Sequence, residues 1–546
     1  MPGMSDAAAR LDHVIARTMR ATGLPGMAVA LTDRARLLHV SAHGFADVAA
    51  RVPVTPETLF EIGSISKSFT SIALLRQRDA GRVDPRDPVT RHLPWFQVRS
   101  AFAPIAVAHL LNHTAGIIRG ADMTPGSRYE VAALRETETA WPPGQRFYYS
   151  NVGYQALGYL LEDALGQTYG DIMRAHVLDP LGMTATAPVI THETRTRLAI
   201  GYRPFYDDRP AQVGQPLAPA PWLEYGGGDG SIASTPIDMA VYLRMLLNRG
   251  VGPRGRILSE EGFGLLIQPS VERGDHTSYG FGLEVSECDG HTYIGHSGGM
   301  VGYRALILAD MDDGLGAVVL TNGEVEYDVT QLALDVLPAV AQFAIDLTRA
   351  VAQQRALPPL PRAPVSVGAT DAAVYAGAYR SATATVTITA EGDQVMLRHN
   401  QDCIALERRG GDDFFVNHPD FALFLLRFGR EGDRIVEAFH GPDRYTNDRY
   451  RGPLAFAHSP PWDAYPGHYR AHTPWTSNFR VALRKGALVL IMPGGDEQRL
   501  TPLGDGVFGV GERGATPERL CFDTVIAGRA LRACLSGCHY YRSFTP

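Results

Sequence analysis

The sequence is poor in lysine. Of its 51 basic residues only two are lysines, Lys67 and Lys485, so arginine supplies almost every positive charge. The sequence also lacks an apolar run of about 18 residues, the length that a membrane-spanning helix needs. It has no cluster of basic residues of the kind that binds nucleic acid. We therefore expect neither a membrane nor a nucleic acid as a partner.

Cysteine is scarce as well, and its distribution argues against a disulfide framework. The five cysteines are an odd number, are scattered, and have no histidine cluster beside them that would complete a zinc site. The N-terminus has neither the basic region nor the unbroken apolar region of a secretory signal. We expect reduced, buried cysteines in a cytoplasmic protein, with no metal and no organic cofactor. The cysteines are Cys288, Cys403, Cys521, Cys534 and Cys538.

Length and composition indicate a globular protein of several domains. A chain of 546 residues is too long for one ordinary hydrophobic core, so two to four domains are expected. Hydrophobic residues make up 45% and charged residues 20%, and the formal net charge is −7. These values are typical of a soluble protein.

The first region, residues 1–356, mixes helices with strands. Helices between two sets of antiparallel strands predict an α+β domain, an antiparallel sheet with helices, rather than a doubly wound parallel sheet. Strands are expected at 26–32, 37–41, 292–294, 303–308 and 316–321, and helices at 68–82, 235–249 and 329–356.

The remainder of the chain is rich in strand patterns. A proline-rich linker is expected at 357–368. Residues 375–380 and 465–470 share the pattern Tyr-x-Gly-x-Tyr-Arg, 90 residues apart, and each copy is followed by alternating apolar and polar residues. This repeat predicts two small antiparallel β-barrel domains, residues 369–455 and 456–546. A chance similarity of two strand starts is the alternative.

Lys67 lies three residues after Ser64, at the start of a predicted helix, so both side chains share one helix face. With 22 serines and two lysines, roughly 0.1 Ser-x-x-Lys matches are expected by chance. A lysine held out of water can exchange a proton with a neighbouring hydroxyl, which an arginine cannot do. The alternative is an exposed lysine in a first helical turn.

Two further short motifs follow in the chain. In Tyr149-Ser150-Asn151 a phenol beside a cation can act as a general base, and the Asn151 amide can orient a substrate carbonyl or the lysine. Alone, a Tyr-x-Asn motif indicates ordinary loop structure rather than a catalytic site.

The third motif, His296-Ser297-Gly298-Gly299, lies at the end of the strand predicted at 292–294. The backbone N–H groups of Ser64 and Gly299 are candidates for an oxyanion hole, in which each donor typically contributes about 10²–10³ in rate. A lone histidine is more often structural than catalytic.

Together, the three motifs resemble the serine β-lactamase and penicillin-binding-protein superfamily, in particular its class C β-lactamase and D-aminopeptidase branch. The two barrels resemble the three-domain layout of bacterial D-aminopeptidases. Further matching segments are 60–63 (FEIG), 109–116 (HLLNHTAG) and 228–235 (GDGSIAST), and the resemblance covers about residues 10–350.

The resemblance implies a covalent mechanism without a cofactor. Ser64 is acylated, its proton passes to Lys67 or Tyr149, and which of them accepts first is left open. Tyr149 then serves the leaving group and the attacking water. Asn151, His296 and Gly298 are expected to contact the substrate.

The substrate implied is a small molecule or short peptide, specifically a D-amino acid amide or peptide. His296 stands where β-lactamases have a lysine that helps to bind the substrate carboxylate, so we expect poor penicillin hydrolysis. A carboxylesterase or transacylase, or a penicillin receptor that acylates without turnover, remains an alternative, and assembly of identical chains is left open. The turn 511–516 and the stretch 204–230 are candidate walls of the substrate cleft.

A competing motif is present in the same region. Residues 295–299 also spell Gly-x-Ser-x-Gly, the nucleophile elbow of α/β-hydrolases, which would make Ser297 the nucleophile. That elbow requires a helix directly after the serine, whereas residues 300–308 favour a strand. The downstream histidines that it also requires, such as His399, fall in the predicted barrels.

Overall fold

The computed structural model describes residues 3–120, 126–212, 214–274, 276–324, 332–361 and 371–544. The chain divides into two compact units. Unit 1 comprises Met1–Arg203, Pro216–Val325 and Asp335–Ala363, and unit 2 comprises Pro204–Gln215, Glu326–Leu334 and Pro364–Pro546.

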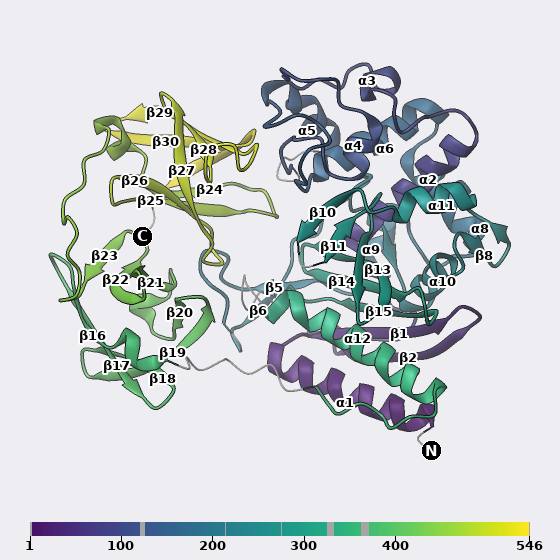
Figure 1. Cartoon of the computed structure of the whole chain (residues 1–546), viewed down its shortest axis with the longest axis horizontal. Coiled ribbons are helices and arrows are strands. Elements are labelled where there is room, and N and C mark those ends of the chain that lie inside the picture. The colour runs from purple at the N-terminus through teal and green to yellow at the C-terminus, as the bar shows by residue number, and fades with distance from the viewer. Residues whose placement is uncertain are drawn as a thin grey trace. The chain divides into compact units, whose positions relative to one another are not determined.

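An antiparallel sheet forms the centre of unit 1, with nine strands in the described ranges (Figure 1). The strand β1 pairs with β15, so the N-terminal hairpin continues the sheet formed late in the chain. In sheet order the strands are β10 (Val271–Gly274), β11 (Thr277–Tyr279), β12 (Glu284–Cys288), β13 (His291–Met300), β14 (Tyr303–Asp310), β15 (Leu315–Thr321), β1 (Gly26–Asp33), β2 (Leu37–Asp47) and β3 (Val52–Pro53).

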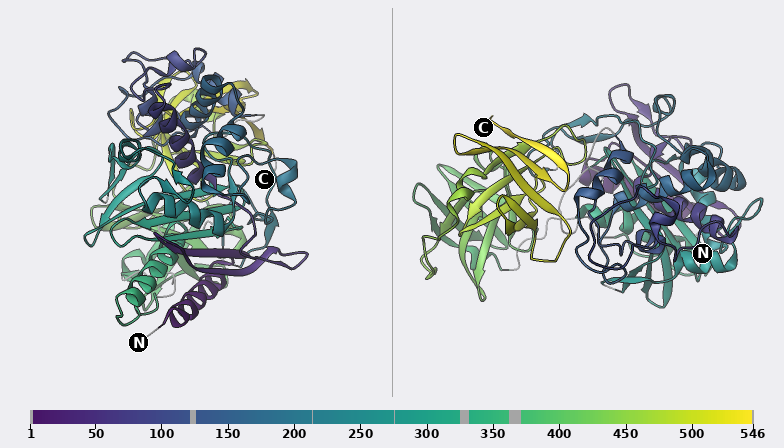
Figure 2. Two further views of the ribbon diagram at one scale, coloured as in Figure 1. Left: turned by 90° about the vertical axis from the view of Figure 1, so that its right-hand side faces the viewer. Right: turned by 90° about the horizontal axis from the view of Figure 1, so that it is seen from above.

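Helices cover both faces of this sheet. Alternate residues of a strand face opposite sides, and β15 is buried at every position, so both of its faces are covered. On one face, Val319 of β15 shares a hydrophobic core with Leu11 of α1 (Met4–Thr22) and with α12 (Leu332–Ala352). In Figure 1 and in the left view of Figure 2, α1 and α12 lie beside each other along the sheet. On the other face, Gly316 lies against Leu243 of α10 (Pro236–Leu247).

The remaining helices of unit 1 lie between β3 and β10 in the chain. They are α2 (Ser66–Asp79), α3 (Val89–His92), α4 (Val107–Leu111), α5 (Ser127–Ala133), α6 (Asn151–Leu165), α7 (Tyr169–Met173), α8 (Asp179–Leu181), α9 (His192–Arg195) and α11 (Glu260–Ile267). The predicted α+β class is confirmed. Both predicted internal helices are present, although α2 begins and ends slightly earlier than expected, and residues 329–331 of the predicted last helix lie outside the described residues.

Unit 2 contains two closed antiparallel barrels, each of eight strands among the residues described, which confirms the predicted pair. The first consists of β16 (Gly377–Arg380), β17 (Thr385–Glu391), β18 (Gln394–His399), β19 (Asp402–Gly410), β20 (Asp413–Val416), β21 (Leu426–Glu431), β22 (Arg434–His440) and β23 (Asp443–Thr446). The second consists of β24 (Gly467–Arg470), β25 (Asn478–Arg484), β26 (Ala487–Ile491), β27 (Glu497–Gly504), β28 (Val507–Val510), β29 (Arg519–Ile526), β30 (Arg529–Leu535) and β31 (Cys538–Ser543).

The repeated motif has the same structure in both barrels. The Tyr379 hydroxyl donates a hydrogen bond to the Tyr375 carbonyl at 2.7 Å, and the Tyr469 hydroxyl does the same to the Tyr465 carbonyl at 2.7 Å. Both second tyrosines are fully buried. The two copies are therefore equivalent structural units, in which one tyrosine closes the turn that precedes the first strand.

The arginine that ends each motif differs in its partner. Arg380 in the first barrel pairs with the exposed Asp448 at 2.8 Å. Arg470 in the second barrel binds the carboxylate of Asp207 at 2.9 and 2.7 Å, and Ser477 donates to the same carboxylate at 2.7 Å. Asp207 belongs to the segment Pro204–Gln215, which groups with unit 2.

The five cysteines are free, as expected, but most of them are not buried. Cys538 is buried, Cys521 and Cys534 are partly exposed, and Cys288 and Cys403 are exposed. The predicted domain limits at 356, 369 and 456 stay predictions, and residues 362–368 of the linker lie outside the described part.

Among the helices that the structure describes, none has the length and apolar character that crossing a membrane would require.

Candidate active site

Ser64 lies in a short 3-10 turn, η1 (Gly63–Ile65), that leads directly into α2. Its side chain is half-buried, whereas Ser66 and Ser68 just after it are fully buried. Ser66 accepts a hydrogen bond from the Ile232 backbone N–H at 3.1 Å and is thereby committed to structure. Of these serines, Ser64 is the one with a hydroxyl that a ligand can approach.

Lys67 is fully buried beside Ser64. Its Nζ lies 3.0 Å from Ser64 Oγ, 2.8 Å from Asn151 Oδ1 and 2.8 Å from the carbonyl oxygen of Asp229. The predicted Ser64–Lys67 proximity is thus present, and the alternative of an exposed lysine is wrong.

These contacts suit both protonation states of the lysine. The oxygens of Asn151 and Asp229 can only accept, so Nζ donates to each of them. In an ammonium the third N–H points to Ser64 Oγ. In a neutral amine the lone pair takes that place and accepts from the Ser64 hydroxyl. A proton can therefore move between Ser64 and Lys67 without any hydrogen bond being lost.

Tyr149 and Asn151 flank the start of α6. The Ser150 side chain accepts from the Gly153 backbone N–H and caps the helix, so Asn151 is its first residue and Tyr149 lies just outside. The Lys67 Nζ lies 4.9 Å from the centre of the Tyr149 ring. The cap thus brings the phenol and the amide to the same ammonium, as the sequence predicted.

His113 supports this arrangement from behind. Its Nδ1 accepts from the Ser150 backbone N–H at 3.1 Å, so the ring proton lies on Nε2, which has no hydrogen-bond partner among the described residues. The imidazole packs on the Tyr149 ring with 4.2 Å between centres. Burial, followed by the charge of Lys67, holds the pKa of His113 well below its usual value, so the ring is neutral.

His296 lies in β13, and both of its ring nitrogens are engaged. Nδ1 donates to the Ser297 carbonyl, because a carbonyl can only accept, and Nε2 therefore accepts from the Tyr279 hydroxyl at 2.8 Å. Burial lowers the pKa of His296 to about 4. The imidazole is neutral at neutral pH, so it does not supply the positive charge of the lysine that it replaces.

The backbone of β13 packs directly against η1, the turn that carries the candidate nucleophile Ser64 (the nucleophile turn). A Cβ on Gly298 would lie 1.9 Å from the Ile62 carbonyl oxygen, and a Cβ on Gly63 would lie 2.6 Å from the Gly299 nitrogen. Gly63 also has φ +51°, in the left-handed region. This close approach brings the backbone of Gly299 next to that of Ser64, the pair expected to form the oxyanion hole.

Asp229 lies in the matching segment 228–235, but the sequence predicts no site role for it. Its carbonyl accepts from Lys67, and its buried carboxyl accepts from the Tyr225 hydroxyl at 2.7 Å. Burial raises the pKa of the Asp229 carboxyl, while the nearby ammonium of Lys67 opposes that shift. No local signal marks a backbone acceptor, since any residue type can supply a carbonyl.

Ser297 does not have the environment of a nucleophile elbow. It is exposed within β13, and β14 follows after two residues where an elbow requires a helix. The α/β-hydrolase alternative is therefore wrong.

The residues able to hold a metal lie elsewhere. Within the described ranges, two groups of histidines and carboxylates come close enough to share an ion, and neither includes a residue of this site. The groups are His399 with His418 and Asp420, and His291 with Asp310 and Asp312.

Known proteins are similar to parts of this chain in sequence. Residues 11–340 match the beta-lactamase family model. Penicillin-binding protein 4 of Amycolatopsis lactamdurans is 28% identical over 320 residues, which is 55% of this chain and 82% of that protein. Protein flp of Staphylococcus aureus strain N315 is 26% identical over 340 residues, 59% of this chain and 64% of that protein.

Two solved structures are similar in fold. The octameric penicillin-binding protein homologue from Pyrococcus abyssi has a TM-score of 0.58 and 24% identity, and the match covers 81% of this chain and 99% of that one. The penicillin-binding protein from Bacillus halodurans has a TM-score of 0.50 and 24% identity, covering 60% of this chain and 98% of that one.

Proposed function

The chain belongs to the beta-lactamase family, and we propose that it is a serine hydrolase that forms an acyl-enzyme on Ser64 and cleaves amide bonds of small substrates, such as D-amino acid amides or short peptides. The observation that carries this proposal is the position of Lys67. It is fully buried, with Nζ 3.0 Å from the Ser64 hydroxyl and 2.8 Å from Asn151.

The first chemical step is attack of Ser64 Oγ on the substrate carbonyl. The hydroxyl proton passes to Lys67 or to the Tyr149 phenolate, and the C–O bond forms as the carbonyl oxygen becomes an oxyanion. The backbone N–H groups of Ser64 and Gly299 stabilise that oxyanion. The tight packing of Gly298 on Ile62 supports this role, because it fixes β13 against the nucleophile turn.

The second half of the reaction needs an acid and then a base. Tyr149 protonates the leaving amine as the tetrahedral intermediate collapses to the acyl-enzyme. Tyr149 then takes a proton from water, which attacks the ester carbonyl of the acyl-enzyme. The bond from the carbonyl carbon to Ser64 Oγ breaks, the acid product leaves, and Ser64 Oγ regains a proton from the Lys67 or Tyr149 group that holds it. The position of the Tyr149 ring supports both roles, since its centre lies 4.9 Å from Lys67 Nζ, which itself contacts the Ser64 hydroxyl.

The neutral state of His296 guides the choice of substrate. In β-lactamases a lysine at this position helps to bind the substrate carboxylate, and a neutral imidazole provides no such charge. Burial keeps His296 neutral above a pKa of about 4. We therefore propose that penicillins and cephalosporins are poor substrates and that amides without a carboxylate at that position are preferred.

An activity panel tests the proposal. The purified chain and its Ser64→Ala variant are assayed with D- and L-amino acid amides, short-chain p-nitrophenyl esters and a cephalosporin. We expect turnover of D-amides by the wild type and its loss in Ser64→Ala, with Ser297→Ala as the matched control that keeps activity.

Other outcomes of the panel would favour the alternative functions given above. Turnover of simple esters alone would identify an esterase or transacylase. A burst of acylation without turnover would identify a receptor that stays acylated. Full activity in Ser64→Ala would overturn the proposed nucleophile.

A further inference from the structure

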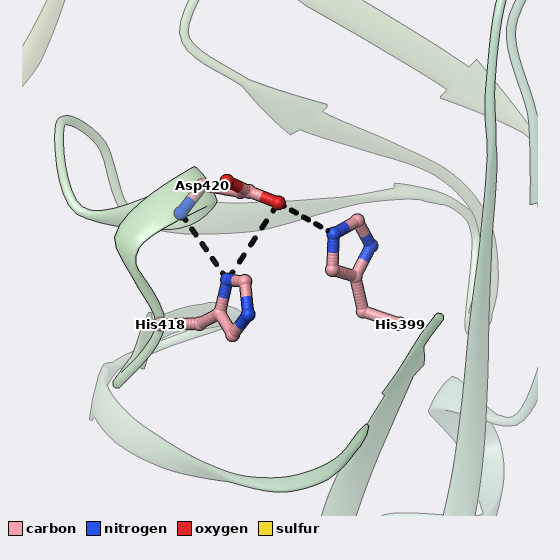
Figure 3. A group of neighbouring side chains, drawn as sticks. All are labelled: His399, His418 and Asp420. Carbon is pink, nitrogen blue, oxygen red and sulfur yellow. Dashed lines mark hydrogen bonds and ion pairs between the residues drawn. The ribbon is translucent and has the colours of Figure 1, made fainter. Parts of the chain in front are cut away.

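The first barrel carries a cluster of potential metal ligands at one end. His399 is the last residue of β18, and His418 directly precedes the short 3-10 helix η5 (Pro419–Phe421), which contains Asp420. Figure 3 shows the imidazoles of His399 and His418 directed at the same carboxylate oxygen of Asp420. The three residues come from two segments of the chain and meet only in the folded barrel.

The distances within the cluster are close to those of a coordination sphere. Asp420 Oδ2 lies 2.8 Å from His399 Nε2 and 3.9 Å from His418 Nδ1. Around a tetrahedral zinc ion with bonds of about 2.0–2.1 Å, neighbouring ligand atoms are about 3.3 Å apart. All three ligand atoms lie within 4.8 Å of one another, so side-chain adjustments can bring them to the separations of one coordination sphere.

One hydrogen bond in the cluster must be released before a metal can bind. His418 Nδ1 accepts from the Asp420 backbone N–H at 3.2 Å, so its proton lies on Nε2, and its single lone pair can bind an ion once that hydrogen bond is exchanged for the metal bond. That Nε2 lies 3.7 Å from Asp402 Oδ2, which is longer than a hydrogen bond, and a closer approach would let this carboxylate orient the imidazole as second carboxylates commonly do in metal sites. His399 Nε2 shares a proton with Asp420, at the place that a cation would take.

Packing holds the two rings in position. Phe421 is 4% exposed, and its ring lies 5.1 Å from that of His399 and 6.3 Å from that of His418. The imidazoles are themselves half-buried, with side-chain exposures of 23% for His399 and 19% for His418. The cluster is thus accessible to an ion on one side and fixed by an aromatic ring on the other.

The second group of potential ligands lacks this character. In the group of His291, Asp310 and Asp312, the carboxylate of Asp310 already binds the guanidinium of Arg349 at 2.5 Å. Its other oxygen accepts the backbone N–H of Asp312 at 3.0 Å. A fixed cation thus occupies the place of an ion there.

We propose that His399, His418 and Asp420 bind a divalent transition metal ion of the zinc class and that the ion stabilises the first barrel. Two imidazole nitrogens and a carboxylate oxygen are a typical zinc ligand set, with water completing the shell. Binding displaces the proton shared by His399 and Asp420 and joins the β18–β19 turn to η5.

Zinc binding to the full chain tests this site. Protein treated with a chelator is titrated with Zn²⁺ by calorimetry, and its Tm is measured with and without Zn²⁺. Co²⁺ supplies a visible absorption band as a second readout. The site variants are Asp420→Asn and the double change His399→Asn with His418→Asn, and the matched control is His291→Asn in the other group.

We expect one Zn²⁺ per chain, a higher Tm with Zn²⁺, and loss of affinity by about tenfold or more in both site variants. His291→Asn should bind as the wild type does. Asp420 is 60% exposed, so the Asp420→Asn variant should keep the fold even if the double variant does not. Equal Zn²⁺ affinity and equal Tm shifts in the wild type and Asp420→Asn, or no binding by the wild type, would overturn the proposal.

Discussion

At the scale of single residues, the site depends on what an amine can do and a guanidinium cannot. Lys67 is fully buried, and oxygen atoms of Ser64, Asn151 and Asp229 surround its Nζ. A guanidinium is larger, planar and always charged, so it can neither fit these contacts nor accept a proton.

Lys67→Arg should therefore be nearly inactive although it keeps the charge. We expect kcat/KM for the best amide or ester to fall by about 10²–10⁴, the usual contribution of a general base. Lys485→Arg is the matched control, because it changes the other lysine of the chain, which pairs with Glu437 in unit 2. Retention of more than about a tenth of wild-type turnover by Lys67→Arg would argue against proton exchange at Lys67.

His296 links the site to the stability of the fold. Burial lowers its pKa from the ordinary histidine value of 6.5 to about 4, so the unfolded chain binds the proton more tightly than the folded chain. The free energy of unfolding should then fall as the pH drops from about 6.5 to about 4. The shift corresponds to on the order of 3 kcal/mol.

His296→Gln removes this titration. Denaturant unfolding of both proteins at a series of pH values should show a smaller loss of stability in the variant between pH 6.5 and pH 4, with other acid-sensitive groups cancelling in the difference. Parallel curves for the two proteins would contradict a depressed pKa at His296.

The residues that sequence could identify are those related by short spacing. Ser64 and Lys67 are three positions apart on a helix, and Tyr149 and Asn151 are two apart at a helix start, so each pair was predictable. The contribution of the Asp229 carbonyl was not, because it depends on backbone position. His113 was visible only as part of a matching segment, since its contact with Tyr149 exists only after folding.

At the scale of elements, the site depends on a strand packed against a turn with almost no space between them. Gly298 on β13 faces the Ile62 carbonyl next to η1, where a Cβ would come within 1.9 Å. The sequence predicted the strand but placed its end too early, at residue 294, because glycines are poor strand formers. Tertiary packing extends β13 to Met300.

Gly298→Ala should separate β13 from the nucleophile turn. Overpacking of this kind typically costs about 1–3 kcal/mol in the free energy of unfolding, and we expect a larger relative loss of kcat because Gly299 moves with its neighbour. Gly264→Ala is the control, since a Cβ there meets nothing within 4 Å and the residue lies in α11. Wild-type kcat in Gly298→Ala would show that the close approach does not matter for the reaction.

At the scale of the whole molecule, the grouping of segments into units departs from their order in the sequence. The two barrels were predictable from the repeated tyrosines, since each motif forms its own closing hydrogen bond. The assignment of Pro204–Gln215 to unit 2 was not. The contacts of this segment within unit 2 include the pair Asp207 and Arg470, which are 263 positions apart in the sequence.

Asp207→Asn tests this contact. Loss of the charge on a half-buried carboxylate that accepts from Arg470 and Ser477 should lower the stability of unit 2 by about 1–3 kcal/mol. Asp448→Asn is the matched control, because Asp448 pairs with the equivalent Arg380 but is 88% exposed, and such a surface pair contributes about 0–1 kcal/mol. Equal losses of stability in the two variants would show that the contact of Asp207 contributes no more than the surface pair of Asp448.

The segment Pro204–Gln215 also determines what a single cut in the chain can achieve. A protease site introduced between residues 361 and 371 would break the peptide backbone, yet the N-terminal fragment would still carry Asp207, which binds Arg470 of the C-terminal fragment. The two fragments should therefore remain associated after cleavage, as a split protein does. Separating the halves requires loss of that docked segment as well as of the linker.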